Sequence, residues 1–468
     1  MRTIPTFVIN LEKRLDRKAH LIEQFRSRIE FDMQIVTPVD HYDGCVSLWM
    51  TIQQIVKDHL QAEYILLCED DHVFQENYSP TLLMGAISEA QIMQADILAG
   101  GVSWFNNAHK VSDNLYWVEK FSGLQFTVLF KSFFATILSA SFTLDDVADL
   151  KLGSLTDSKF FISPFISIQK EFGYSDATPK NNKNAGRVDT LFRESQHKAN
   201  VIKYIGEYYR KYNPDVRNNA AAYQHLVIPV YVISLPERID RRTHILHEFE
   251  GRNEFDVKII DACRHEKGAV GLWMSICKVI EMAIANEDDL IVLCEDDHTF
   301  TQHYNKEHLL KNIIEAYYQR TEILAGGIGG FDMAIPVNKD RFWINAFYST
   351  QFLVLYKPIF RKVLDYAYDD TVTADGAFSA LTEYKQALFP FISIQREFGY
   401  SDVTAWNNGE GAVTGWFISA GDRMEMTRKA YERYTLHMNG ASIKPVAELP
   451  SAICTSAFTT FTTSTNIE

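Results

Sequence analysis

The sequence predicts an α/β protein of two tandem domains, each built on a mostly parallel β-sheet with helices on both faces. Two observations lead to this prediction. Long stretches of the 468-residue chain occur twice, about 225 positions apart. Within each copy, short apolar runs alternate with stretches whose apolar residues recur at helical spacing. This alternation is typical of parallel strands joined by helices.

The repeat consists of blocks that keep their order along the chain. Residues 5–17 match residues 229–241, and residues 67–72 are identical to residues 293–298. The other matches are residues 48–50 with 272–274, 97–101 with 323–327, and 164–176 with 390–402. A unit of this length is too long for a solenoid repeat, so the blocks indicate a duplicated domain.

Local patterns predict the elements of the first copy in order. An apolar run predicts a strand over 7–11, and apolar residues at helical spacing predict helices over 15–28 and 47–59. A strand over 64–68, a helix over 82–93 and a strand over 96–99 follow. Ligands bind beyond the carboxyl ends of the strands in such sheets, so the residues after the strand at 64–68 are candidates for a site.

The repeat and the composition set the expected boundaries. The first domain spans residues 1–213 and closes with a helix over 189–212, and residues 214–228 form a linker that opens on Pro214. The second domain spans 229–443 and closes with a helix over 417–438. Residues 444–468 are rich in serine and threonine, which predicts a disordered tail. The alternative is that this tail is itself glycosylated.

Charge and cysteine usage narrow the class of protein. The net charge of −14 argues against broad nucleic-acid binding, which needs a basic surface. None of the six cysteines forms a Cys-x-x-Cys pair, which argues against a zinc ribbon and fits a reducing compartment. The chain enters its first strand without a signal peptide and has no run of 18 apolar residues. We therefore expect a cytoplasmic protein without a transmembrane segment, with a peripheral position at the inner membrane surface left open.

Three adjacent acids follow an apolar strand in each copy: Glu69-Asp70-Asp71 and Glu295-Asp296-Asp297. Like charges this close raise one another's pKa, and a divalent cation relieves the conflict. Hard carboxylate oxygens suit Mg²⁺ or Mn²⁺. The alternative is an acidic, solvated loop.

Arginines follow the first strand of each copy: Arg14 and Arg17, then Arg238 and Arg241. The guanidinium fork pairs well with phosphate. The alternative is a charged helix start capped by Asp16 or Asp240. A cationic loop beside an acidic loop at neighbouring strand ends favours a nucleoside-diphosphate site.

Four further features carry weaker signals. Asp149 and Asp375 occupy equivalent positions and are candidates for a general base, with a helix cap as the alternative. His72 and His298 are interpreted as loop residues rather than ligands. The glycine pairs 100–101 and 326–327 allow either a close approach to a ligand or a tight turn. Trp49 and Trp273 fall on apolar helix faces and are predicted to lie in the core.

These motifs together resemble glycosyltransferase family 25, which includes lipooligosaccharide galactosyltransferases and is similar to collagen galactosyltransferase domains. Residues 8–11 with Arg14, Asp16 and Arg17 resemble the opening motif of the family. Residues 43–47 resemble its Gly-Cys-x-x-Ser-His block, and residues 67–71 resemble its Leu-Glu-Asp-Asp metal motif with Cys68 inserted. The resemblance covers nearly all of residues 5–180 and 229–405.

The resemblance implies two GT-A-type, Rossmann-like domains that transfer a hexose, of galactose or glucose type, from a UDP-sugar with inversion. It implies Mn²⁺ or Mg²⁺ as the cofactor, and an acceptor hydroxyl on a glycan, a lipid-linked glycan or a peptide, as in lipopolysaccharide biosynthesis. The implied metal ligands are Asp71 and Asp297, with Glu69 and Glu295 beside them. The implied donor-binding residues are Asn10, Arg14, Arg17, Asp70, Ser234, Arg238, Arg241 and Asp296. The implied catalytic residues are Asp149 and Asp375.

The copies depart from the family pattern and from each other. The Ser-His pair of the family becomes Ser47-Leu48 in one copy and Gly271-Leu272 in the other, and Asn10 becomes Ser234. Trp104 faces Gly330 in the aligned repeat. Three hypotheses remain: two active sites of differing specificity, one active domain with one sugar- or partner-binding domain, and a non-enzymatic scaffold.

Overall fold

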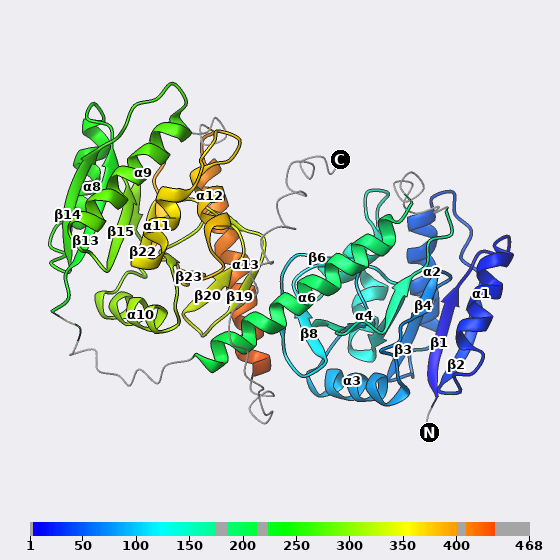
Figure 1. Ribbon diagram of the computed structural model, residues 1–468. Coiled ribbons are helices and arrows are strands. Elements are labelled where there is room, and N and C mark those ends of the chain that lie inside the picture. The colour runs from blue at the N-terminus through cyan, green and yellow to red at the C-terminus, as the bar shows by residue number, and fades with distance from the viewer. Residues whose placement is uncertain (1–2, 174–184, 213–222, 224, 400–408, 436–468) are drawn as a thin grey trace. The chain divides into compact units, whose positions relative to one another are not determined.

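The computed structural model describes residues 3–173, 185–212, 223, 225–399 and 409–435, and these residues form two compact units (Figure 1). The first unit contains residues up to Lys203 together with the end of the last helix from Ala430. The second unit contains Tyr204–Lys429. Each unit is built around one eight-stranded sheet.

The sheet of the first unit is mixed, with most strands in one direction. In sheet order its strands are β2 (Phe31–Val36), β1 (Ile4–Ile9), β3 (Tyr64–Glu69), β10 (Phe126–Phe130), β5 (Ile97–Ala99), β11 (Lys159–Ile162), β8 (Leu115–Val118) and β7 (Ala108–Lys110). Only β10 and β8 run antiparallel to their neighbours, so the other strands share one direction.

The second unit repeats this order. Its strands are β14 (Phe255–Asp261), β13 (Ile228–Ser234), β15 (Leu290–Glu295), β22 (Phe352–Tyr356), β17 (Ile323–Ala325), β23 (Lys385–Leu388), β20 (Arg341–Ile344) and β19 (Ala334–Pro336). Strands β22 and β20 are the antiparallel ones, at the places that β10 and β8 hold in the first unit. The repeated sequence blocks therefore fold into the same topology.

Two-stranded pairs complete each unit beside the main sheet. In the first unit they are β4 (His72–Phe74) with β12 (Ser167–Gln169) and β6 (Trp104–Phe105) with β9 (Phe121–Ser122). In the second they are β16 (His298–Phe300) with β24 (Ser393–Gln395) and β18 (Gly330–Phe331) with β21 (Phe347–Tyr348). These pairs bring residues from late in each repeat next to the acid clusters.

The helices of the first unit form where local signals favour them. They are α1 (Leu15–Phe25), α2 (Gly44–Asp58), α3 (Pro80–Ile92), α4 (Lys131–Ser139), α5 (Ala148–Ser154) and α6 (Arg187–Lys211). Helix α1 buries Arg17, Leu21 and Phe25, which are spaced by four residues on one face. The Asp43 side chain caps α2, and Ser79 caps α3.

Helices cover both faces of the sheet in the second unit, as predicted. They are α8 (Ile239–Phe249), α9 (Gly268–Ala285), α10 (Lys306–Tyr318), α11 (Lys357–Asp365), α12 (Ala374–Leu381) and α13 (Ala412–Thr435). One core cluster joins α9, α11 and α12 to the sheet, and a second joins α8 and α10 to the opposite face. The predicted α/β class, with helices on both faces of a mostly parallel sheet, is confirmed.

The predicted domain boundaries can be compared with the structure only in part. The predicted closing helices correspond to α6 and α13, although the division between the units falls inside α6, after Lys203. Residues 213–222, 224 and 436–468 lie outside the described residues, so most of the predicted linker and the whole tail are not described.

One helix of the described residues, α9, is long and apolar enough to cross a membrane by length and composition alone. It carries Lys278 and Glu281, and it packs its Trp273, Ile276 and Val279 into the core of the second unit. A core helix of a globular unit passes the same test.

Candidate functional site

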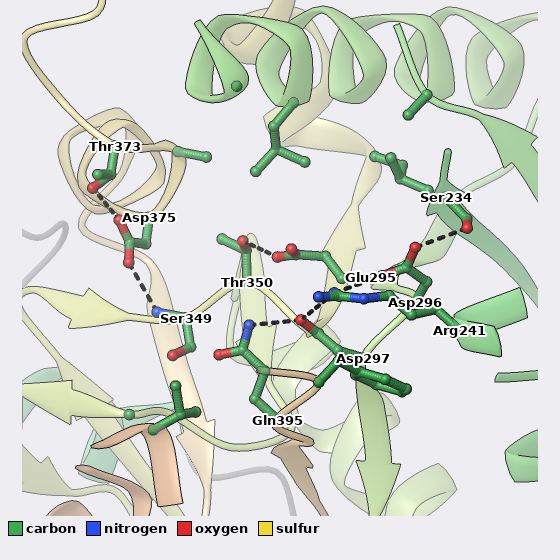
Figure 2. Close-up of a pocket in the computed structure, with 18 of the residues that line it drawn as sticks. Ser234, Arg241, Glu295, Asp296, Asp297, Ser349, Thr350, Thr373, Asp375 and Gln395 are labelled. Atoms are coloured by element: carbon green, nitrogen blue, oxygen red, sulfur yellow. Dashed lines mark hydrogen bonds and ion pairs between the residues drawn. The ribbon is translucent and has the colours of Figure 1, made fainter. Parts of the chain in front are cut away.

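A cavity of about 980 Å³ opens at the carboxyl ends of β13 and β15 in the second unit. The strand register explains why the site residues meet there. Ile233 pairs with Glu295 in the parallel β13–β15 ladder, so Ser234 and Asp296 leave the sheet side by side. The cavity is lined by the acid cluster, both arginines, the turn after β21 and the start of α12 (Figure 2).

The central acid of the second cluster is held from two sides. Ser234 Oγ donates to Asp296 Oδ2 at 2.8 Å. Arg241 bridges the two aspartates, at 3.2 Å from Asp296 Oδ1 and 3.3 Å from Asp297 Oδ2. Arg238 lies further out, 3.8 Å from Asp296. The buried Arg241 therefore serves as the counter-charge of the cluster.

The two outer acids are protonated more readily than ordinary carboxyls. Burial and the neighbouring Asp297 raise the pKa of Glu295 to about 8, and Thr350 Oγ1 donates to its Oε1. Burial and the charge of Asp296 raise the pKa of Asp297 to about 6. Gln395 Nε2 donates to Asp297 Oδ2 at 3.0 Å. Arg241 and Arg238 together supply less positive charge than three ionised acids would carry as negative charge.

The first unit assembles the same residues. Asn10 Nδ2 donates to Asp70 Oδ2 at 3.0 Å, and Arg17 reaches Asp70 Oδ1 at 2.7 Å and Asp71 Oδ2 at 3.4 Å. Arg14 lies 3.3 Å from Asp70 Oδ2. Burial raises the pKa of Asp71 to about 7 against the opposing charge of Arg17.

Glu69, the first acid of the first cluster, also has a raised pKa. Burial, with the charges of Asp71 and Asp149, raises its pKa well above the usual range. Gln169 Nε2 donates to Glu69 Oε2 at 2.9 Å. The equivalent glutamine of the second unit, Gln395, binds the third acid instead of the first. The clusters share their acids and their buried arginine, but the equivalent glutamines bind different acids.

Within the described part of the chain, the third acid of each cluster has one oxygen that is free to bind a divalent cation. Oδ1 of Asp71 and Oδ1 of Asp297 are buried, and no described residue donates a hydrogen bond to either. A buried carboxylate oxygen without a partner is costly, and a cation removes that cost. The described residues contain no cluster of three or more His, Cys, Asp or Glu that holds a metal by itself. Mg²⁺ in phosphate sites takes one or two carboxylates and completes its shell with substrate phosphate and water, so the residues fit a cation shared with a diphosphate.

Asp149 and Asp375 face the clusters but do not cap helices. Each is the second residue of its helix, whose N-cap residues are Val147 and Thr373, so the helix-cap alternative is wrong. Asp149 accepts hydrogen bonds from the backbone of Gly123 at 2.9 Å and Leu150 at 2.7 Å. Burial raises the pKa of Asp149.

Asp375 repeats this arrangement. It accepts from the backbone of Ser349 at 2.9 Å and of Gly376 at 2.8 Å (Figure 2). Its charge contributes to the raised pKa of Glu295, which places it across the cavity from the cluster. Asp16 and Asp240 are likewise not caps, because the N-cap residues of α1 and α8 are Arg14 and Arg238.

The interpretation of His72 and His298 as loop residues is wrong. Both lie in short strands and are fully buried. Nδ1 of His72 lies 2.7 Å from Ser167 Oγ, and burial lowers the pKa of His72 to about 3. The His298 ring makes the same contact with Ser393. They are neutral core residues, as Trp49 and Trp273 are core residues.

The second glycine of each pair lies against a strand of the same unit that crosses closely over it. A Cβ on Gly101 would lie 2.2 Å from the Ser167 carbonyl oxygen, and one on Gly327 would lie 1.9 Å from that of Ser393. Glycine is required because β12 and β24 pass directly over these positions. Their passage carries Gln169 and Gln395 to the acid clusters.

Sequence reasoning missed four residues of the site. Gln169 and Gln395 belong to the repeated blocks 164–176 and 390–402, and this repetition was the signal that could have identified them. Thr350 gave no signal, because its equivalent in the first copy is Leu124. Tyr348 was missed for the same reason, since Ser122 replaces it.

Comparisons with known proteins give little. No protein-family model matches the sequence, and no curated protein matches it. Among solved structures, one similar chain is apo UDP-glucose pyrophosphorylase, with a TM-score of 0.25 and 9% identity over 41% of this chain and 82% of that chain. A likeness this slight says nothing about the function of this chain.

Proposed function

We propose that the protein is a divalent-cation-dependent glycosyltransferase that moves a hexose from a UDP-sugar to an acceptor hydroxyl, with one site in each unit. The observation that carries the proposal is the buried, unpartnered Oδ1 of Asp297, in a residue that lines a large cavity beside two arginines. Asp71 repeats it in the first unit. The transfer of a sugar, rather than another diphosphate chemistry, is supported by the resemblance of the motifs to glycosyltransferase family 25.

Each cluster divides into residues that hold the cation and residues that hold the nucleotide. Asp71 and Asp297 hold the cation, with Glu69 and Glu295 beside them. When bound, the cation offsets the negative charge that builds on the departing diphosphate. Arg14 and Arg238 bind the nucleotide end of the donor at the rim. Arg17 and Arg241, which are buried against the acids, fix the orientation of the carboxylates.

The acceptor side of the site is opposite the nucleotide side. Asp375 takes the proton of the acceptor hydroxyl, whose oxygen attacks the anomeric carbon as the bond to the diphosphate breaks. The two backbone N–H groups on Asp375 hold its carboxylate in place for this step. A single displacement inverts the anomeric centre. Asp149 has the same role in the first unit.

Release of UDP from UDP-glucose and UDP-galactose, with and without Mn²⁺, tests the proposal. We expect Mn²⁺-dependent release that falls by roughly 100-fold in the Asp71→Asn/Asp297→Asn double variant, because the cation loses its charged ligands. The matched control is Asp32→Asn/Asp256→Asn, which neutralises two exposed strand aspartates at equivalent positions. A wild-type protein that neither releases nor binds UDP would overturn the proposal.

A second candidate is one active unit with one sugar- or partner-binding unit. The exchange of the glutamine contact favours it: Gln395 occupies one oxygen of Asp297, whereas Gln169 leaves Asp71 and binds Glu69. The carboxylate proposed to hold the cation is therefore differently surrounded in the two units.

A further inference from the structure

An exposed tyrosine forms one wall of the cavity in the second unit. Strand β18 pairs with β21 so that Gly330 lies directly opposite Tyr348. A Cβ on Gly330 would lie 3.0 Å from Tyr348 Cδ2, so the tyrosine ring lies over the glycine. Tyr348 remains 47% exposed although it lines the cavity. About half of the tyrosine is thus accessible to a ligand in the cavity.

A tryptophan approaches the same strand from a helix. Helix α13 packs beside β18, where the Phe417 ring lies 3.6 Å from the Cβ position of Gly329 and Arg423 donates to the Phe331 carbonyl at 2.9 Å. Trp416, next to Phe417, also lines the cavity and is 39% exposed. Two large aromatic side chains from different elements therefore border one end of the cavity.

The first unit exposes an aromatic residue at the same strand pair, but from the opposite strand. Trp104 of β6 lies across from Ser122 of β9 and is 44% exposed. The large and small members of the pair are exchanged between the units, from Trp–Ser to Gly–Tyr. The position of Trp416 is occupied by Leu191 in the first copy, because Phe192 and Phe417 make equivalent ring contacts.

The aromatic pair lies at the acceptor end of the proposed site. Tyr348 directly precedes Ser349, whose backbone N–H binds Asp375. Figure 2 shows Asp375 and Ser349 on one side of the acid cluster and Ser234 on the other, with Glu295 between them. In the proposed site the nucleotide of the donor lies on the Ser234 side. A ligand that contacts Tyr348 is therefore on the Asp375 side, where the acceptor hydroxyl gives up its proton.

We propose that Tyr348 and Trp416 form the acceptor subsite of the second unit and that they bind the C–H face of a pyranose ring. This rests on the proposed function. A pyranose carries its hydroxyls around its edge and C–H groups on its faces, so an aromatic ring buries the apolar face and leaves the hydroxyls free to reach Asp375. The exchange of the aromatic between strands means that the first unit binds its acceptor in a different orientation.

Saturation-transfer NMR tests the subsite, with methyl β-galactoside, methyl β-glucoside and methyl N-acetyl-β-glucosaminide as probes on the full chain with UDP and Mn²⁺. We expect saturation of the ring C–H protons of at least one probe. The signal should fall by about five-fold or more in Tyr348→Ser/Trp416→Leu, which installs the residues of the first copy. Tyr318→Ala removes a more exposed aromatic ring outside the cavity and should leave the signal unchanged.

Two results would overturn the subsite: no probe is saturated by the wild-type protein, or the signal survives in the double variant. Calorimetric titration with UDP and Mn²⁺ shows whether the aromatic residues bind the donor nucleotide instead of the acceptor. Affinity for UDP that is unchanged in the double variant supports an acceptor subsite, whereas a loss of about ten-fold would mean that the aromatics bind the uracil base and would overturn it. A wild-type protein that fails to bind UDP contradicts the proposed function instead.

Discussion

At the scale of single residues, Arg17 and Arg241 explain how three adjacent acids are tolerated at the end of a buried strand. Each guanidinium bridges the second and third acid of its cluster, and each is nearly inaccessible to water. Arg14 and Arg238 add a second positive charge at the rim of each cluster, and two positive charges do not balance three negative ones. Burial therefore pushes the pKa values of the outer acids upward, as at Glu295 and Asp71. A divalent cation would let all three acids ionise.

His109 provides a pH test that is independent of the acid clusters. Burial lowers its pKa from 6.5 to about 3, so the folded protein keeps it neutral while the unfolded chain protonates it below pH 6.5. The unfolded state then binds more protons, and the free energy of unfolding falls as the pH drops through this window. The His109→Phe variant keeps a ring against Trp117. Its free energy of unfolding should therefore fall by about 2 kcal/mol less than that of the wild type between pH 7 and pH 5.

Urea titration at the two pH values, followed by circular dichroism, measures this difference. His72 has a similarly lowered pKa and remains in the variant, so part of the acid sensitivity should persist. His303→Phe changes an exposed histidine and should leave the pH dependence as it is. An unchanged slope in His109→Phe would show that His109 is protonated in the folded state.

The sequence predicted the acids and arginines of the site because both follow directly from strand ends. It did not predict which donor holds which acid. Gln169 and Gln395 lie about a hundred positions from their partners, and identical sequence blocks bring them to different acids. The choice depends on neighbours such as Thr350, which donates to Glu295 where the first unit has Leu124. Such contacts are set by packing in three dimensions rather than by local pattern.

At the scale of elements, the crossing of β24 over Gly327 fixes the position of Gln395. Gly327→Ala places a methyl group against the Ser393 carbonyl oxygen, which cannot move without breaking the β16–β24 pair. We expect a loss of about 3 kcal/mol in the free energy of unfolding, measured by urea titration. The weakened pair should also reduce Mn²⁺-dependent UDP binding, because Gln395 contacts Asp297.

Gly415→Ala is the matched control, because nothing lies within 4 Å of the added methyl group. Gly415 is an exposed position inside α13, where alanine should stabilise the helix by about 0.5–1 kcal/mol. A Gly327→Ala protein as stable as the wild type would show that the strand crossing is not rigid.

Most elements predicted from local patterns have six or more residues, although the three-residue β5 was predicted as well. Strand β3 begins at Tyr64 as predicted and ends at Glu69. Helix α2 begins at Gly44 rather than at residue 47 because Asp43 caps it through the N–H groups of Cys45 and Val46. Strands of two or three residues, such as β4 and β12, are too short to show periodicity. They form only because distant segments pair. His72 was misassigned for that reason.

At the scale of the whole molecule, two units of the same topology carry the same acids in differing pockets. The sequence repeat predicted both, since equivalent blocks fold into equivalent strands. The division of the chain inside α6 was not predictable, because the helical pattern continues across Lys203 without a break. Whether both pockets bind a donor depends on the surroundings of Asp71 and Asp297, which differ.

Calorimetric titration with UDP in the presence of Mn²⁺ counts the donor sites. We expect two sites per chain in the wild type, because each unit has a buried carboxylate oxygen without a protein partner. Asp71→Asn and Asp297→Asn should each leave one site, since asparagine removes the charge that the cation requires. Asp32→Asn and Asp256→Asn, at exposed positions of the same units, should keep both. If the wild type has a single site and only one of the two variants loses it, one unit is catalytic and the other is degenerate. The unit that carries the mutation in that variant is then the catalytic one.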